Sequence, residues 1–390
     1  MELAQRLSAI PPYPFMELRR KIGEARARGM DVISLGVGDP VEGTPEEVIE
    51  ELAQQARNPA NHPYPLDEEK GMLAFREAVA EWYGRRYGVT LDPETEVLGL
   101  IGSKEGVHHF VLARVNPGDV VLMTDPGYPA YQASILIGGG EPRSVPITAK
   151  NGYLPKLEDI PSSVASKATA MFVNYPNNPT GAVATRAFFA ELVAFAKEYD
   201  VAICHDGAYS EMLFDGAERL SFLNAPGARE VGIELNSLSK PYNMTGWRIG
   251  MAMGNRDLIA GLSKVKENTD SGIFAPIQYA AIRALKEGDA HIVRMLGIYA
   301  KRRALVVETL RSLGWKYDPP KGTFYLWIPT PEGMGALDFA TLLFERASVV
   351  VAAGTAYGQY GEGFVRIALT VPDARLEEAM ERIRKVLSSR

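Results

Sequence analysis

The 390-residue sequence contains one cysteine, Cys204. It also has no run of about 18 apolar residues such as a membrane-spanning helix needs. A single cysteine cannot form an internal disulfide, so we expect a buried structural thiol and a reducing compartment, the cytoplasm. The first residues lack the uninterrupted apolar core of an export signal. The sequence therefore predicts a protein that works in solution and does not bind a membrane.

Motifs for several kinds of chemistry are also missing. The sequence has no H-E-x-x-H, no G-x-x-x-x-G-K-[ST] and no G-x-G-x-x-G between a strand and a helix. This argues against a zinc peptidase, a P-loop nucleotidase and a Rossmann dehydrogenase. His108 and His109 are expected to form a helix-surface pair, and no metal site is predicted. The net charge of -6, from 42 basic and 48 acidic residues, makes nucleic acid an unfavourable partner.

What is present is the pattern of a folded α/β protein. Apolar residues make up 46% of the chain and charged residues 23%, as in globular proteins. From about residue 45 to 274, helical patterns alternate with short, almost wholly apolar runs, as expected of strands covered on both faces. These runs are VLGLIG (97–102), DVVLMTD (119–125), ATAMFVN (168–174), VAICHD (201–206) and VGIELNSLS (231–239).

The alternation predicts an α/β fold with a largely parallel sheet covered by helices, one of them over residues 186–199. The length corresponds to two or three domains of about 150 residues. After residue 275 the pattern changes to α+β, with a long helical stretch near 276–312. We predict a large domain over residues 44–275. Residues 1–43 and 276–390 are expected to form a smaller α+β domain that closes over the active site.

Polar residues that directly follow the apolar runs are candidates for a binding site, because ligands of open α/β sheets bind beyond the carboxyl ends of the strands. They are Gly102, Ser103 and Lys104 at a helix start, Asn178 in NYPNNPTG, Asp206 with Tyr209, and Ser237, Ser239, Lys240 and Arg248 in SLSKPYNMTGWRIG. The helix start offers free backbone amides to a phosphate.

This combination of residues fits pyridoxal 5'-phosphate, an aldehyde cofactor that carries a phosphate. Lys240 can bind the aldehyde covalently, and Asp206 can pair with the protonated ring nitrogen, which keeps the ring a strong electron sink. The ring oxygen and the phosphate would be held by Tyr209, Asn178, Ser237, Ser239 and Arg248.

The order of the motifs also carries a resemblance. NNPTG, D-x-A-Y, S-x-S-K and G-W-R-I-G, in this order, resemble the fold type I, class I aminotransferases, the aspartate aminotransferase-like enzymes, and the match spans nearly the whole chain. Longer strings look like the LL-diaminopimelate aminotransferases within that family. They are PPYPF, LGVGDP, GSKEG, DPGYP, NYPNNPTGAVA, CHDGAYSEM, SLSKPYNMTGWRIG and GEGFVRIALTVP.

The resemblance implies roles for further residues. Lys240 would hold the cofactor and move the proton, with Asp206 and Tyr209 as the other catalytic residues. Arg366 would clamp the substrate α-carboxylate, helped by Gly38. By the same resemblance, Tyr128 would stack on the cofactor ring, and the substrate would also be contacted by Tyr13, Lys104, Tyr128, Asn178 and Asn268. Gly102, Ser103 and Lys104 are expected to bind the cofactor from their place at the helix start. Tyr64 resembles the tyrosine that reaches the phosphate of the neighbouring subunit, which implies a homodimer with shared active sites.

The resemblance implies transfer of an amino group between an L-amino acid, LL-diaminopimelate-like or acidic, and a 2-oxo acid, with glutamate and 2-oxoglutarate as the partner pair. Two departures lie in loops that shape substrate recognition: PLDEEKG (65–71) is longer by about two residues, and Ala353 stands where the family tends to have proline. Aspartate, alanine, succinyl-diaminopimelate and methionine transamination therefore remain alternatives. A carbon-sulfur β-lyase and a non-catalytic cofactor-binding regulator are the alternatives of another class.

Overall fold

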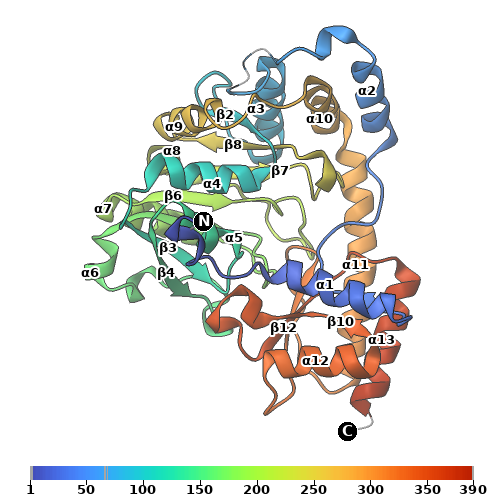
Figure 1. Cartoon of the computed structure of the whole chain (residues 1–390). Helices are drawn as coiled ribbons and strands as arrows, with labels where there is room; N and C mark the ends of the chain where they lie inside the picture. The colour runs from blue at the N-terminus through green and yellow to red at the C-terminus, as the bar shows by residue number, and fades with distance from the viewer. Residues whose placement is uncertain (1–2, 66, 68, 389–390) are drawn as a thin grey trace.

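The computed structural model describes residues 3–65, 67 and 69–388, and Figure 1 shows how its helices and strands are arranged. Leu66 and Glu68, which belong to the lengthened loop after Tyr64, lie outside the described residues. The helices are α1 Pro14–Ala27, α2 Glu46–Ala56, α3 Leu73–Tyr87, α4 Ser103–Arg114, α5 Ala130–Ile137, α6 Ser162–Ala165, α7 Arg186–Tyr199, α8 Ala228–Val231, α9 Arg256–Glu267, α10 Ala275–Glu287, α11 Asp289–Ser312, α12 Ala336–Ala347 and α13 Asp373–Ser388.

A seven-stranded sheet, in the order β2-β8-β7-β6-β5-β3-β4, forms the centre of the described structure. Its strands are β2 Val97–Leu100, β3 Val120–Asp125, β4 Glu141–Pro146, β5 Ala168–Asn174, β6 Ala202–Asp206, β7 Gly232–Ser237 and β8 Gly250–Gly254. Only β8 runs antiparallel to its neighbours, β2 and β7. The predicted largely parallel, helix-covered sheet is confirmed.

Helices cover the sheet on both faces, as the continuous apolar runs predicted. Successive residues of β5 illustrate this: Phe172 packs with residues of α4, α5 and α9, whereas Met171 and Val173 pack with residues of α3, α7 and α10. Cys204, also buried, lies on the same side as Phe172. The expected buried thiol is therefore confirmed.

A second core lies below the central sheet in Figure 1. It contains the antiparallel sheet β11-β12-β9 and packs α11, α12 and α13 around it. The strands are β9 Tyr325–Pro329, β11 Ala352–Ala353 and β12 Phe364–Ala368. The N-terminal segment joins this core, since β1 Ile33–Ser34 pairs in parallel with β10 Val349–Val350.

Three details differ from the sequence prediction. The helical stretch near 276–312 is two helices, α10 and α11, separated by Gly288, where a Cβ would lie 2.4 Å from a ring atom of Tyr242. Strands β4 and β8 were not predicted. His109 is buried, with Nε2 3.9 Å from a Glu105 oxygen, so the predicted surface pair is wrong.

None of the helices in the described part of the chain is both long and apolar enough to cross a membrane.

Candidate active site

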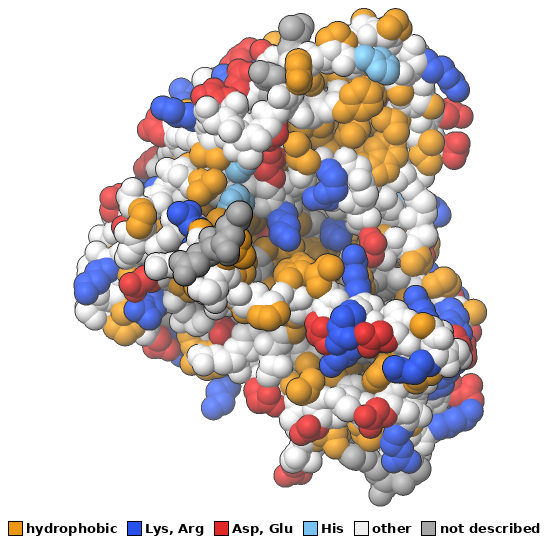
Figure 2. All heavy atoms as spheres, in the orientation of Figure 1, with side chains coloured by type: hydrophobic (Ala, Val, Ile, Leu, Met, Phe, Trp, Pro, Cys, Tyr) orange, Lys and Arg blue, Asp and Glu red, His pale blue; other side chains and the backbone are white. Residues whose placement is uncertain are grey.

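A cavity of about 290 Å³ lies between the carboxyl ends of the central strands and the second core. Figure 2 shows a hollow on this face in which Lys and Arg side chains gather. The sequence-predicted residues that line the cavity are Tyr13, Gly38, Ser103, Lys104, Tyr128, Asn178, Asp206, Tyr209, Ser237, Ser239, Lys240, Arg248 and Arg366. Residues separated by up to 353 positions therefore face one space, as expected if they act on one ligand.

Lys240 follows β7 and projects its amine across the cavity toward the N-terminal segment. Its Nζ donates a hydrogen bond to the Gly38 carbonyl at 3.2 Å. Burial lowers the pKa of this lysine below its ordinary value, because the low-dielectric surroundings disfavour the ammonium form. A lowered pKa leaves more of the amine in its neutral form near pH 7, and only the neutral form can act as a nucleophile or accept a proton.

Asp206 ends β6 and is a buried residue, 6% exposed. Its Oδ2 accepts a hydrogen bond from the Tyr131 hydroxyl at 2.8 Å, and its Oδ1 accepts one from the Ala208 amide at 3.3 Å. Burial raises the pKa of this carboxyl above its ordinary value, and these two hydrogen bonds act in the opposite direction. The ionisation of the Asp206 carboxyl group therefore depends on the groups that donate hydrogen bonds to it.

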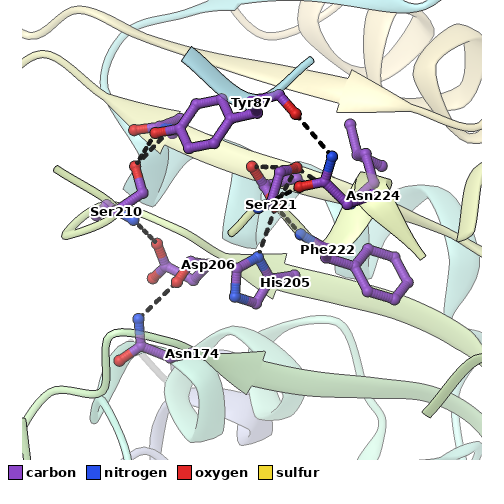
Figure 3. Close-up of polar contacts among 12 residues, drawn as sticks. Tyr87, Asn174, His205, Asp206, Ser210, Ser221, Phe222 and Asn224 are labelled. Atoms are coloured by element: carbon purple, nitrogen blue, oxygen red, sulfur yellow. Dashed lines mark hydrogen bonds and ion pairs between the residues drawn. The ribbon is translucent and has the colours of Figure 1, made fainter. Parts of the chain in front are cut away.

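The strand end that carries Asp206 is fixed on both sides (Figure 3). The Asn174 amide donates to the Asp206 carbonyl at 2.6 Å. His205, the preceding residue, points to the other face of the sheet, where its Nδ1 lies 2.9 Å from Oε2 of the fully buried Glu234. Ser221 Oγ and the Phe222 amide also donate to that carboxylate. This network is away from the cavity and keeps the end of β6 rigid.

Tyr209 and Tyr325 face each other with their hydroxyl oxygens 3.0 Å apart. Burial raises the pKa of Tyr209 well above its ordinary value. Tyr325 belongs to β9, and a Cβ on Gly38 would lie 1.9 Å from its hydroxyl oxygen. Only glycine fits at position 38, because the backbone there passes directly beside this tyrosine.

The N-terminus of α4 faces the same cavity through Ser103 and Lys104. Gly102 precedes the helix with φ +80°, and a Cβ there would lie 2.0 Å from Nη2 of Arg248. Ser237 Oγ accepts a hydrogen bond from the Ser239 amide at 3.1 Å. Free helix amides, two serines and an arginine form a cradle that suits a phosphate.

Arg366 of β12 is buried under two tyrosine rings, with its guanidinium carbon 3.8 Å from the centroid of Tyr325 and 4.9 Å from that of Tyr357. Its Nη1 donates to Asn178 Oδ1 and its Nη2 to the Gly36 carbonyl, both at 2.8 Å. These contacts fix the plane of the guanidinium, which is what bidentate recognition of a carboxylate requires.

The wall formed by α1 and α4 brings two further cations to the cavity. Lys104 Nζ lies 4.8 Å from the centroid of the Tyr13 ring, and Arg19 lines the same space. Within the described chain, neither Lys104 nor Arg19 forms an ion pair with a carboxylate. This wall can therefore attract a second acidic group.

Three predicted residues do not line the cavity of the single chain. Gly102 lies just behind the cradle, as described above. Tyr64 is 78% exposed on the surface. Asn268 is exposed at the end of α9, where its Nδ2 donates to the Lys264 carbonyl at 2.9 Å. The structure of one chain does not bring Tyr64 or Asn268 into the cavity.

Sequence reasoning missed several residues that line the cavity: Met16, Arg19, Val37, Asn174, Ala208, Thr245 and Tyr325. Tyr325 carried a usable signal, since it lies in FYLWI, an apolar run interrupted by a hydroxyl. Arg19 carried none, because an arginine on an amphipathic helix is ordinarily a solvated side chain.

Comparison with known proteins identifies the class of protein that this fold and site define. The family model described as "Aminotransferase class I and II" matches residues 30–383. The chain therefore belongs to the class I and II aminotransferase family, and it is an enzyme that transfers an amino group between an amino acid and a 2-oxo acid.

Individual relatives narrow the similarity. The chain is 54% identical over 387 residues to an LL-diaminopimelate aminotransferase of Moorella thermoacetica, covering 99% of each sequence. It is 52% identical to another protein of that name from Desulforudis audaxviator, covering 98% of this chain and 97% of the relative. Among solved structures, substrate-bound BacF of Bacillus subtilis aligns with a TM-score of 0.95 and 38% identity over 99% of this chain and 98% of that one.

A double mutant of Thermus thermophilus aspartate aminotransferase aligns with a TM-score of 0.91 and 30% identity over 99% of this chain and 100% of that one. The fold is therefore that of the aspartate aminotransferase-like, fold type I enzymes.

Proposed function

We propose that this aminotransferase uses pyridoxal 5'-phosphate, bound to Lys240, to exchange an amino group between LL-diaminopimelate and the glutamate/2-oxoglutarate pair. The observation that carries the cofactor proposal is the donor set around one cavity: an amine of lowered pKa on Lys240, the carboxylate of Asp206, and the phosphate cradle at Gly102. When bound, the cofactor supplies an aldehyde that takes the amino group and a ring that accepts electrons from the substrate α-carbon.

The residues of the chain do the rest. Asp206 would pair with the cofactor ring nitrogen, and Ser237, Ser239 and Arg248 would hold the phosphate. Lys240 would bind the aldehyde and, with its amine free, would take a proton from the substrate α-carbon and return it, so it would serve as anchor and as acid-base. Tyr209 and Asn178 would donate to the ring oxygen, and Tyr128 would stack on the ring.

Arg366 binds the substrate α-carboxylate, because its fork of donors is already oriented by Asn178 and the Gly36 carbonyl. The Gly38 backbone contacts the same carboxylate. With its carboxylate fixed, the substrate can present the bond to the α-hydrogen toward Lys240.

Two observations support a substrate with a second acidic group. The relatives at 54% and 52% identity are named LL-diaminopimelate aminotransferases. In addition, Lys104 and Arg19 place positive charge on the wall formed by α1 and α4, next to the ring of Tyr13. Aspartate, alanine, succinyl-diaminopimelate and methionine remain alternative substrates. No observation favours a carbon-sulfur β-lyase.

The partner proposal is a homodimer. Tyr64 is 78% exposed, Phe274 42% and Ile49 38%. Figure 2 shows hydrophobic side chains gathered at the upper right of this face, over α2 and α10 of Figure 1. We infer that a second copy of the chain covers this surface and receives Tyr64 in its own cavity. The cytoplasmic location stays a prediction from the single cysteine.

A half-reaction panel tests the substrate. The purified holoenzyme is incubated with one amino acid at a time while the absorbance of the lysine-bound cofactor is followed. We expect rapid loss of that absorbance with LL-diaminopimelate and glutamate, and little with alanine or methionine. An equal response to aspartate and alanine would indicate a general aminotransferase. Release of pyruvate and ammonia without any oxo-acid acceptor would indicate a lyase.

Mass spectrometry after borohydride reduction tests the cofactor. We expect one pyridoxyl phosphate adduct, located on Lys240. In Lys240→Ala the adduct should be absent and turnover abolished, while the melting temperature of the cofactor-free protein stays within a few degrees of wild type. Lys264→Ala, on the exposed side of α9, is the control and should retain the adduct. An adduct on another lysine would overturn the assignment.

A further inference from the structure

Tyr131 is the second residue of α5 and is fully buried. Its ring stacks on Phe172 of β5, with centroids 4.9 Å apart and planes inclined by 6°, and the edge of Tyr128 packs against it at 5.7 Å. This stacking fixes the plane of the Tyr131 ring and therefore the direction in which its hydroxyl points. In that orientation its O–H donates to Asp206 Oδ2 at 2.8 Å.

Asp206 needs such a donor. A buried carboxylate in a low-dielectric site is driven toward its neutral form, and burial raises the pKa of Asp206 accordingly. The hydrogen bond from Tyr131 is the largest effect that opposes this rise, followed by the Ala208 amide, whose bond is longer at 3.3 Å. Tyr131 itself does not line the cavity. Its O–H can reach the cofactor through Asp206, whereas its ring also packs against Tyr128, which lines the cavity.

We propose that Tyr131 is a positioning residue whose O–H holds Asp206 in the orientation and ionised state that pair it with the cofactor ring nitrogen. This rests on the proposed function, because it assumes that pyridoxal phosphate occupies the cavity. Without the donor, the ring nitrogen would hold its proton less firmly. The cofactor would then be bound more weakly and would be a weaker acceptor of electrons from the substrate.

The test is Tyr131→Phe, which removes one oxygen and keeps the ring that stacks on Phe172. We expect the dissociation constant of the cofactor, measured after stripping and titration, to rise roughly ten- to hundred-fold, as for loss of a hydrogen bond to a charged group. The pH midpoint of the absorbance change of the lysine-bound cofactor should move upward, because a less positive ring repels the proton at that linkage less. The turnover number should fall while KM for the amino acid changes little.

Tyr87→Phe is the matched control. Tyr87 is also buried, and its phenol also donates to a carboxylate, Glu211, at 2.8 Å, but neither of these two residues lines the cavity. Figure 3 shows Tyr87 beside Ser210, whose Oγ lies 2.8 Å from the Tyr87 hydroxyl. Cofactor affinity and the absorbance midpoint should equal those of wild type in this variant.

A double-mutant cycle shows whether the effect passes through Asp206. Because Tyr131 acts through that carboxylate, Tyr131→Phe should weaken cofactor binding much less in an Asp206→Asn background than in wild type. Equal losses in both backgrounds would overturn the proposal, as would unchanged affinity and midpoint in Tyr131→Phe. Loss of the fold in that variant would also contradict it, since the O–H would then belong to the scaffold. A wild-type protein without a borohydride-trapped adduct would instead show that the proposed function had failed first.

Discussion

Lys240 and Asp206 are both placed where burial disfavours their charged forms. Burial lowers the pKa of the lysine and raises that of the aspartate. A bound cofactor would use both, since it takes the neutral amine of Lys240 and offers a positive ring nitrogen to the Asp206 carboxylate. In the cofactor-free protein nothing offsets the burial of these two groups, so the site lowers the stability of the folded state.

Removal of the buried acid should therefore stabilise the cofactor-free protein. A raised carboxyl pKa means that the folded state binds the proton more tightly. The stabilising contribution of Asp206 is therefore present below pH 3.8, the ordinary pKa of an aspartate. It is lost as the pH rises through the pKa of the folded state. At pH 7 we expect Asp206→Asn to be more stable than wild type by about 1 kcal/mol in urea unfolding, with the difference shrinking toward pH 4. Asp159→Asn, an exposed aspartate, is the control. A less stable Asp206→Asn at pH 7 would contradict this account.

The residues that could be predicted from the sequence are those that follow apolar strands, because their polar character contrasts with the run before them. Asp206 and Lys240 are of this kind, and both line the cavity. Tyr131 could not be predicted in this way, since its neighbours in AYQASILI are those of any packed helix. Its role depends on Phe172 and Asp206, which lie far away in the sequence and meet it only in the fold.

At the scale of elements, the N-terminus of α4 is the part of the cradle made of backbone. Gly102 has φ +80°, which favours glycine, and no room for a Cβ beside Arg248. The helix start and the arginine can approach one another only because position 102 has no side chain.

We expect Gly102→Ala to displace Arg248 and to weaken cofactor binding by at least ten-fold, because both the backbone amides and the guanidinium move. The readout is titration of the stripped protein with pyridoxal phosphate, compared with titration with phosphate-free pyridoxal. The variant should lose most of the preference for the phosphorylated form. Gly261→Ala in α9 is the control, where the nearest atom to a new Cβ is an alanine Cβ at 3.3 Å. An unaltered preference in Gly102→Ala would count against the cradle.

A buried ion cluster ties α4 to α9. Lys266, fully buried, places Nζ 3.0 Å from Glu105 Oε1 and 2.9 Å from Asp270 Oδ1. Burial, with Asp270 as its neighbour, raises the pKa of Glu105 to about 7 despite the lysine. Removing the cation would leave two carboxylates close together without a partner.

Lys266→Met should lower the free energy of unfolding by about 3–5 kcal/mol, the usual effect of breaking a buried pair. The loss should be smaller at pH 6 than at pH 8, since Glu105 can take up a proton when its partner is gone. Urea unfolding at both pH values measures it. Lys264→Met, exposed on the same helix, should change stability by less than about 0.5 kcal/mol. Equal stability of the two variants would mean that the cluster does not join the helices.

A helix or strand could be predicted where its sequence carried one clear apolar pattern. The helix at 186–199 was predicted with the bounds of α7, because its apolar spacing is regular. Strand β4, EPRSVP, lies at the edge of the sheet and buries little of itself, so it has no apolar run to detect. Strand β8, GMAMG, was not predicted, and only its first residue, Gly250, belongs to the motif SLSKPYNMTGWRIG. The break at Gly288 depends on contact with Tyr242, which only the fold brings near.

On the scale of the whole molecule, the cavity takes its residues from both cores. Asp206 ends β6 and Lys240 follows β7 of the central sheet, whereas Arg366 and Tyr325 belong to the small antiparallel sheet. A movement of one core against the other would therefore change the distance between the carboxylate clamp and Lys240. The domain limits at 44–275, with 1–43 and 276–390, stay a prediction, as does closure over the substrate.

The shared active site makes a prediction about mixed subunits. If Tyr64 acts in the cavity of the neighbouring copy, Tyr64→Ala and Lys240→Ala homodimers should each be strongly impaired. A hybrid dimer, however, contains one site in which an intact Lys240 meets an intact Tyr64. We expect refolded equimolar mixtures to regain activity toward a quarter of wild type, since half of the dimers are hybrids and each holds one complete site.

Size-exclusion chromatography with light scattering should show dimers throughout, and differently tagged subunits allow the hybrid to be purified. A mixture of Lys240→Ala with Asp206→Asn is the control. Both changes lie in the same chain's cavity, so every site in that mixture lacks one of them and no activity should return. If the mixture of Tyr64→Ala with Lys240→Ala regains no activity, Tyr64 acts in the cavity of its own chain, and the site is complete within one copy.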